Sequence, residues 1–211
     1  MRFRCDAGLL GIVLLWGNMA AGRVGEGGAE IRVLVNNSVR MSGSVLNHAE
    51  EEAARIFRTA GIDIVWANCL GGFVLAADVC RHSPGSNEFV MHIVANGRTS
   101  SDLVFGLSFL DPDGAGKYSD IFYDRVEEAH RQMGEDISQL LGTVAAHELG
   151  HLLLGSNAHS CSGIMAPVWR KDILRKVEMG NLYFSSEQAS RMKARIRNGE
   201  TRMAMGTSAG K

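Results

Sequence analysis

Residues 147–165 read HELGHLLLGSNAHSCSGIM, and the rest of the chain is interpreted outward from this stretch. His147 and His151 are four residues apart. Because an α-helix has 3.6 residues per turn, both imidazoles project from one helix face, about one turn apart. Two such imidazoles can clamp a metal ion, and Glu148 is close enough to reach a water on that ion without binding the metal. The spacing predicts a helix that carries two metal ligands and a general base.

The residues around this motif have the pattern of a half-buried helix. Apolar side chains recur at three- and four-residue intervals, at Leu140, Leu141, Val144, Ala145, Leu149 and Leu152. Ser138 is a candidate N-cap, and Gly155 offers a helix stop. The alternative is a helix that merely carries two histidines in its core.

Two histidines do not complete a catalytic zinc site, which uses three protein ligands and leaves a fourth position for water. His159 is the nearest candidate, because a helix that stops at Gly155 lets the chain turn back under itself within four residues. The alternatives are Asn157 and a downstream acid, either Asp172 or Glu178. We favour His159 because imidazole suits zinc and an amide does not. The expected cofactor is one catalytic Zn²⁺.

Composition and net charge limit the classes to which the protein can belong. With 211 residues, 45% of them hydrophobic and 21% charged, the chain fits one globular domain with a sizeable core. The net charge of -1 provides no basic excess to displace counterions from a phosphate backbone. We therefore expect no nucleic-acid partner.

The N-terminus has the order of a secretory signal peptide: basic residues, an apolar run and small residues. Arg2 and Arg4 precede the run Gly8–Trp16, and Asn18–Gly22 follows it. The run is short for a bilayer span, although a retained membrane anchor is the alternative. We predict a signal peptide over 1–22, a secreted or periplasmic protein, and no stable membrane span after cleavage.

The remaining chain divides into three predicted parts. Residues 23–29 are a flexible Gly-rich leader, residues 30–197 form the catalytic domain, and residues 198–211 are a disordered tail.

Export would leave three cysteines in the mature chain. Cys69 and Cys80 lie eleven residues apart, and in an oxidising compartment they are the favoured disulfide pair. Cys161, two residues after His159, is then either a small buried hydrophobe or a thiolate close to the metal.

Periodicity predicts the order of the other elements. Strands are expected where apolar and polar residues alternate or where apolar runs meet turns, and helices where apolar residues repeat with helical spacing. The expected strands are 30–37, 62–66, 88–94, 103–110 and 118–123, and the expected helices are 45–60, 124–133, 171–177 and one after Ser185. The first strand, helix and strand predict a parallel βαβ unit.

One of the last two strands is expected to be an exposed edge beside the cleft. They flank the sequence DPDG at residues 111–114, for which a plain turn is favoured over a calcium loop, because the rest of an EF-hand loop is absent.

The stretch HELGHLLLGSNAHSCSGIMAP resembles the metzincin metalloproteases, whose pattern is HExxHxxGxxH followed by a Met-containing turn. The family pattern has glycine at the position of Leu154 and histidine at Asn157, whereas this chain has Gly155 and His159. Met165 follows His147 by eighteen residues, as the Met-turn does in matrixin-like members. Nearly the whole chain is also similar to a group of secreted, metzincin-like bacterial proteins. The segments that carry this similarity are ARIFRTAGIDIVW (Ala54–Trp66), GSNAHS and GIM.

The resemblance implies an α/β (α+β) fold: a twisted mixed sheet packed by an active-site helix and a backing helix, with an edge strand along the cleft and a C-terminal helix. It implies a zinc metallopeptidase that hydrolyses peptide or protein substrates, with Glu148 as general base. Two alternatives remain: a secreted zinc-binding module without catalysis, in which Cys161 could close the metal shell, and hydrolysis of a non-peptide bond.

Overall fold

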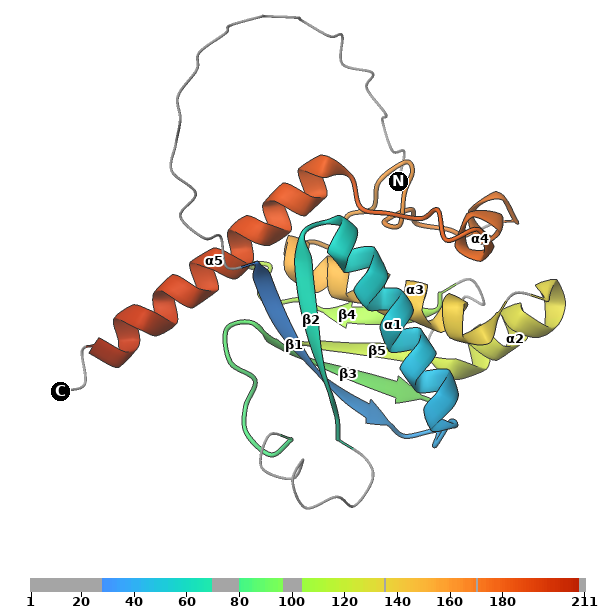
Figure 1. Cartoon of the computed structure of the whole chain (residues 1–211), viewed down its shortest axis with the longest axis horizontal. Helices are drawn as coiled ribbons and strands as arrows, with labels where there is room; N and C mark the ends of the chain where they lie inside the picture. The colour runs from blue at the N-terminus through green and yellow to red at the C-terminus, as the bar shows by residue number, and fades with distance from the viewer. Residues whose placement is uncertain (1–27, 70–79, 97–103, 135, 170, 209–211) are drawn as a thin grey trace, which may run out of the picture.

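Alternating apolar residues build a sheet with one thoroughly buried face. The computed structural model describes residues 28–69, 80–96, 104–134, 136–169 and 171–208. The strands are β1 (Ala29–Asn37), β2 (Ile62–Asn68), β3 (Glu88–Val94), β4 (Gly106–Phe109) and β5 (Tyr118–Phe122). They form one mixed sheet in the order β2-β1-β3-β5-β4, in which only β4 is antiparallel to its neighbour (Figure 1).

In the described part of the chain, five helices accompany this sheet. They are α1 (Gly43–Thr59), α2 (Tyr123–Met133), α3 (Ile137–Leu154), α4 (Lys171–Glu178) and α5 (Ser186–Ser208). The parallel pairing of β1 and β2 around α1 confirms the predicted βαβ unit, and the edge position of β4 confirms the predicted edge strand. Within the described residues, no helix is both long and apolar enough to cross a membrane.

The core lies between the sheet and the helices α1 and α3. Register places Val33 beside Phe89 and Ile93 beside Ile121, so the apolar side chains of neighbouring strands face the same side. These side chains join α1 and α3 in one buried cluster. At the crossing of the two helices, a Cβ on Gly142 would lie only 2.4 Å from the Ala49 carbonyl oxygen, so glycine there lets the helices approach closely.

Helix α3 is buried on nearly every side. Its residues from Leu140 to Leu153 are all buried, because the sheet, α1 and α5 surround it. The sequence predicted a half-buried helix with Ser138 as its N-cap. The N-cap is instead Asp136, whose side chain accepts from the backbone N–H groups of Ser138 and Gln139. A carboxylate at this position is also stabilised by the positive end of the helix dipole.

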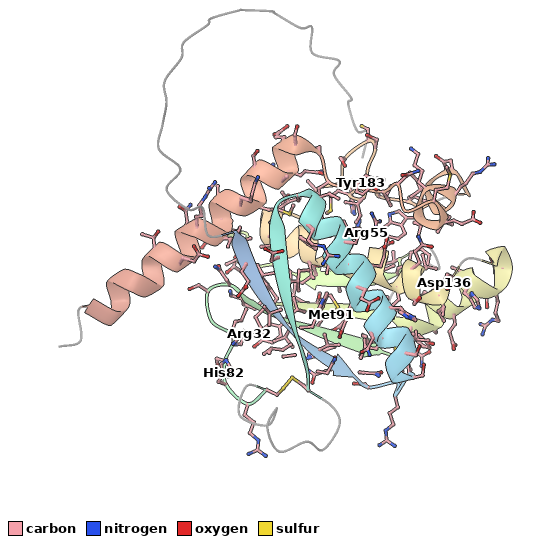
Figure 2. The ribbon with its side chains drawn as sticks, viewed as in Figure 1. Arg32, Arg55, His82, Met91, Asp136 and Tyr183 are labelled. Atoms are coloured by element: carbon pink, nitrogen blue, oxygen red, sulfur yellow. A yellow bond between two sulfur atoms is a disulfide. The ribbon has the colours of Figure 1, made fainter. Side chains whose placement is uncertain are left out.

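The predicted disulfide is present. Cys69 at the end of β2 bonds Cys80, with their Cα atoms 5.6 Å apart, and the bond is visible as a yellow link in Figure 2. The C-terminus departs from expectation, since α5 continues to Ser208 through the segment predicted to be a tail. Glutamate, arginine, alanine and methionine in that segment favour helix. The predicted signal peptide and most of the predicted leader lie outside the described residues.

Candidate metal centre

Three histidines gather on one side of α3. His147 and His151 project from the helix, and His159 comes from the loop that follows it; one nitrogen from each lies within 4.8 Å of the others. The Nε2 atoms of His147 and His151 are 3.1 Å apart. No other cluster of three or more histidine, cysteine or acidic ligands occurs among the described residues.

Backbone carbonyls orient the two helical imidazoles. The Nδ1 of His147 lies 2.7 Å from the Ile164 oxygen, and the Nδ1 of His151 lies 2.9 Å from the Ser156 oxygen. A carbonyl only accepts, so each Nδ1 carries the hydrogen and each Nε2 presents a lone pair toward the cluster. This is the arrangement that metal-binding histidines use.

The histidines are held neutral. Burial, aided by the nearby imidazole of His151 and more weakly of His159, lowers the pKa of His147 to about 3. Burial also lowers the pKa values of His151 and His159. Neutral imidazole is the form that binds a metal, so the cluster is ready for a cation at neutral pH.

Glu148 is buried against the edge strand. Its Oε2 lies 2.7 Å from the Ser108 hydroxyl, which also lies 2.8 Å from the Glu148 backbone oxygen. Burial raises the pKa of Glu148 to about 7, and the hydrogen bond from Ser108 acts in the opposite direction. A carboxyl with a pKa near neutrality can both take and return a proton.

Gly106 on β4 makes room for this carboxyl group. A Cβ at Gly106 would lie 2.7 Å from Oε1 of Glu148 and 2.8 Å from the Asp120 backbone oxygen. Both distances are shorter than real side chains allow. The edge strand therefore carries a glycine where the side chain from α3 meets it.

Met165 is fully buried. A Cβ at Gly150 would lie 2.7 Å from the Met165 sulfur and 2.8 Å from the Phe184 ring, so the underside of α3 packs directly on both. Phe184 also packs on Phe57 of α1, with ring centroids 5.0 Å apart. Phe184 thus lies between α3 and the backing helix α1.

Ile164, the residue before Met165, is held through both its N–H and its carbonyl oxygen. Ile164 donates its N–H to the Tyr183 oxygen at 3.1 Å, while its own oxygen faces His147. The Tyr183 hydroxyl lies 3.2 Å from Nη1 of Arg55 on α1, and Figure 2 shows these two side chains together. The backing helix therefore contacts the segment that orients the first histidine.

A cleft opens beside the cluster, between β4 and the segment after Met165. The histidines and Glu148 line it together with Ser108, Gly106 and Asn157, and its other walls are apolar: Val104, Phe105, Leu107, Val144, Ala166, Pro167 and Trp169. The Trp169 ring meets His147 edge-on at 5.5 Å and lies 5.9 Å from Phe105.

The structure separates the alternatives left open by the sequence. His159 joins the cluster, whereas Asn157 lines the cleft with an exposed side chain, and Asp172 and Glu178 are exposed on α4. Cys161 is exposed and lies outside the three-histidine cluster. The expectation that Cys161 is a small buried hydrophobe is wrong, because its side chain is exposed. Its closeness to the metal stays a prediction.

Sequence reasoning missed Ser108, Gly106 and Trp169. Ser108 was visible only as one polar residue within the apolar run of a predicted strand. Its contact with Glu148 depends on how β4 lies against α3, which periodicity along the chain does not report.

No family model matches this chain. No curated protein matches it either. Among solved structures it is similar to archaemetzincin from Methanopyrus kandleri, with 14% sequence identity, a TM-score of 0.50, and coverage of 82% of this chain and 99% of that chain. At this identity the likeness shows the fold. The predicted fold class, a mixed sheet packed by an active-site helix and a backing helix, is confirmed.

Proposed function

We propose that the chain is a zinc-dependent metallopeptidase, with His147, His151 and His159 as metal ligands and Glu148 as general base. The observation that carries this proposal is the meeting of three neutral imidazoles and one buried carboxyl group in a single cleft. The likeness to a protein named archaemetzincin agrees with the metzincin-like motif in the sequence.

The donor set fits zinc. Zinc binds imidazole nitrogen at about 2.0–2.1 Å in tetrahedral geometry, which separates two ligand nitrogens by about 3.4 Å. The 3.1 Å between the Nε2 atoms of His147 and His151 is close to that separation. Three protein ligands would leave a fourth position for water.

A bound zinc ion would supply Lewis acidity, which generates a nucleophile from water near neutral pH and polarises a carbonyl group. Glu148 would take the proton of the attacking water and later return it to the leaving amine. Ser108 would hold the Glu148 carboxylate in place through the 2.7 Å contact. The Ile164 carbonyl oxygen would keep the His147 ring in its orientation.

The proposed substrate is an extended peptide. The free edge of β4 could pair with a peptide backbone and place its carbonyl beside the histidines, as in β-strand addition. The walls beyond the cluster are apolar, so we expect an apolar side chain next to the scissile bond.

The substitution Glu148→Gln tests the mechanism. Glutamine keeps the shape of the side chain but cannot take the proton, so turnover should fall by about 10²–10⁴ while one equivalent of zinc stays bound. Glu178→Gln, an exposed change on α4, is the matched control and should retain activity. Full activity in Glu148→Gln would rule out the proposed role of this residue.

A zinc-binding module without catalysis is the second candidate, and it predicts a closed metal shell. Cys161→Ser should leave zinc stoichiometry and affinity unchanged, because Cys161 lies outside the three-histidine cluster. Loss of zinc in this variant, or zinc binding without cleavage across an unbiased peptide library, would favour the module.

We also propose that the chain is exported. The order of residues in 1–22 supports this, and so does the disulfide between Cys69 and Cys80, since such bonds persist in oxidising compartments. N-terminal sequencing of the protein recovered outside the cytoplasm should find a start near Gly22. A start at Met1 would contradict cleavage.

A further inference from the structure

The segment from Gly155 to Ser160, the third-ligand loop, places its histidine two residues later than the metzincin pattern does. His159 is also the least buried of the three clustered histidines. A longer loop that carries a metal ligand needs added restraint, because each ordered residue costs about 1–2 kcal/mol of backbone entropy. The structure places one element, α5, against both ends of this loop.

At the start of the loop, Arg195 of α5 sits against Gly155. A Cβ at Gly155 would lie 2.3 Å from Nη1 of Arg195, so the guanidinium occupies the place a side chain would take. Nη2 donates to the Gly114 oxygen at 2.9 Å, and Gly114 itself packs on the Gly155 carbonyl. Arg195 thus joins the β4–β5 turn to the end of α3.

This end of α3 controls the second histidine. Gly155 has a φ of 64°, in the left-handed region, and donates its N–H to the His151 oxygen at 3.0 Å. The next residue, Ser156, accepts from Nδ1 of His151. A shift of Gly155 would therefore turn the His151 ring as well as the loop.

At the far end of the loop, Gln188 of α5 contacts Ser160. The Gln188 side-chain nitrogen lies 3.4 Å from the Ser160 hydroxyl, and the Ser160 N–H donates to the Met165 oxygen at 2.8 Å. Gln188 and Arg195 are seven residues apart, about two helical turns, so they lie on one face of α5. Met192 between them is fully buried and anchors that face in the core.

We propose that α5 clamps the third-ligand loop and that Arg195 is a positioning residue for His151 and His159. The inference rests on the proposed metal site. Arg195 would touch neither metal nor substrate; it would fix the backbone from which both ligands are aimed. Groups that orient metal ligands from outside typically change metal affinity by about 10–100-fold when they are altered.

The test compares Arg195→Gln with Arg197→Gln, a matched change at an exposed arginine on the same helix. Zinc affinity is measured by competition with a chelator, and the absorption spectrum of the cobalt-substituted protein reports ligand geometry. Arg195→Gln should bind zinc at least about tenfold more weakly and show an altered cobalt spectrum, while its metal-free unfolding temperature stays close to that of Arg197→Gln.

Unchanged zinc affinity in folded Arg195→Gln would overturn the proposal, and so would equal losses in both variants. If Arg195→Gln does not fold, Arg195→Lys replaces it under the same criterion, because lysine keeps the charge and the stem but lacks the planar fork. Failure of the metal site itself is recognised separately: the wild-type protein would then bind no zinc, and His159→Ala would change nothing.

Discussion

The Nε2 atoms of His147 and His151 face each other across 3.1 Å, while each Nδ1 is engaged by a backbone carbonyl. Both facing nitrogens therefore present lone pairs, which do not attract each other. A cation between them turns this contact into a stabilising one. The pair is thus a feature of the folded chain that favours a bound metal.

Zinc should stabilise the folded protein. A ligand that binds only the folded state adds RT ln(1 + [L]/Kd), about 2.7 kcal/mol at one hundred times Kd. We expect a higher unfolding temperature with zinc and its reversal by a chelator, measured by calorimetry. His159→Ala should lose most of this increase. His130→Ala should keep it, because His130 lies on α2 and outside the three-histidine cluster. An equal increase in both variants would exclude His159 as a ligand.

Ser108→Ala should impair catalysis but not zinc binding. The change removes the hydroxyl that lies 2.7 Å from Glu148, and we expect kcat/KM to fall about tenfold, equivalent to about 1.4 kcal/mol. Because this hydrogen bond lowers the pKa of Glu148, its loss should raise that pKa and move the acidic limb of the kcat/KM profile to higher pH. An unmoved limb would mean that Glu148 does not define it.

Gly106→Ala should destabilise the protein and reduce activity. The added methyl group would meet Glu148 and the backbone of Asp120 at distances that force a shift, at a cost of about 1–3 kcal/mol. Gly43→Ala is the control, because a Cβ there has no neighbour within 4 Å. Urea unfolding of both variants measures the difference. Equal stability would show that β4 moves freely away from α3.

Glu50 should make stability depend on pH. It lines a small apolar cavity between α1, α3 and the sheet, and burial raises its pKa from 4.5 to about 7, against the effect of a hydrogen bond with Asn68. The folded state therefore holds this proton more tightly than the unfolded state, and the stability it contributes below about pH 4.5 is lost as pH rises through 7.

Glu50→Gln should remove this dependence. Between pH 5 and 8, the wild-type protein should lose more stability than the variant by on the order of 1 kcal/mol, a figure reduced for partial solvent screening. Glu51→Gln, at the exposed neighbouring position, should behave like the wild-type protein. Urea unfolding at the two pH values provides the measurement, and parallel losses in all three proteins would contradict the prediction.

The sequence predicted those parts of the site that depend on local geometry. His147 and His151 share a helix face because of helix periodicity, and Glu148 follows His147 directly on the same helix. The turn at Gly155 brings His159 back within a few residues. The Cys69–Cys80 disulfide was also within reach of sequence reasoning, because the two residues are close along the chain.

The remaining features depend on how distant elements pack. Ser108 meets Glu148 only because β4 lies beside α3, and Arg195 meets Gly155 only because α5 returns to the end of that helix. At the start of α3, Asp136 and Ser138 are both good capping residues. Residue type alone therefore does not show at which of the two the helix begins. The surface position of Cys161 likewise follows from a turn that has no periodic signal.

The edge strand β4 is only four residues long and pairs with β5 on one side. A long free edge invites other copies of a protein to add strands and aggregate, whereas a short one provides too few backbone hydrogen bonds to hold a neighbour by itself. A peptide that also engages the adjacent cleft would have further sources of binding energy. The brevity of β4 thus protects the protein from self-association at the edge where we propose that an extended peptide docks.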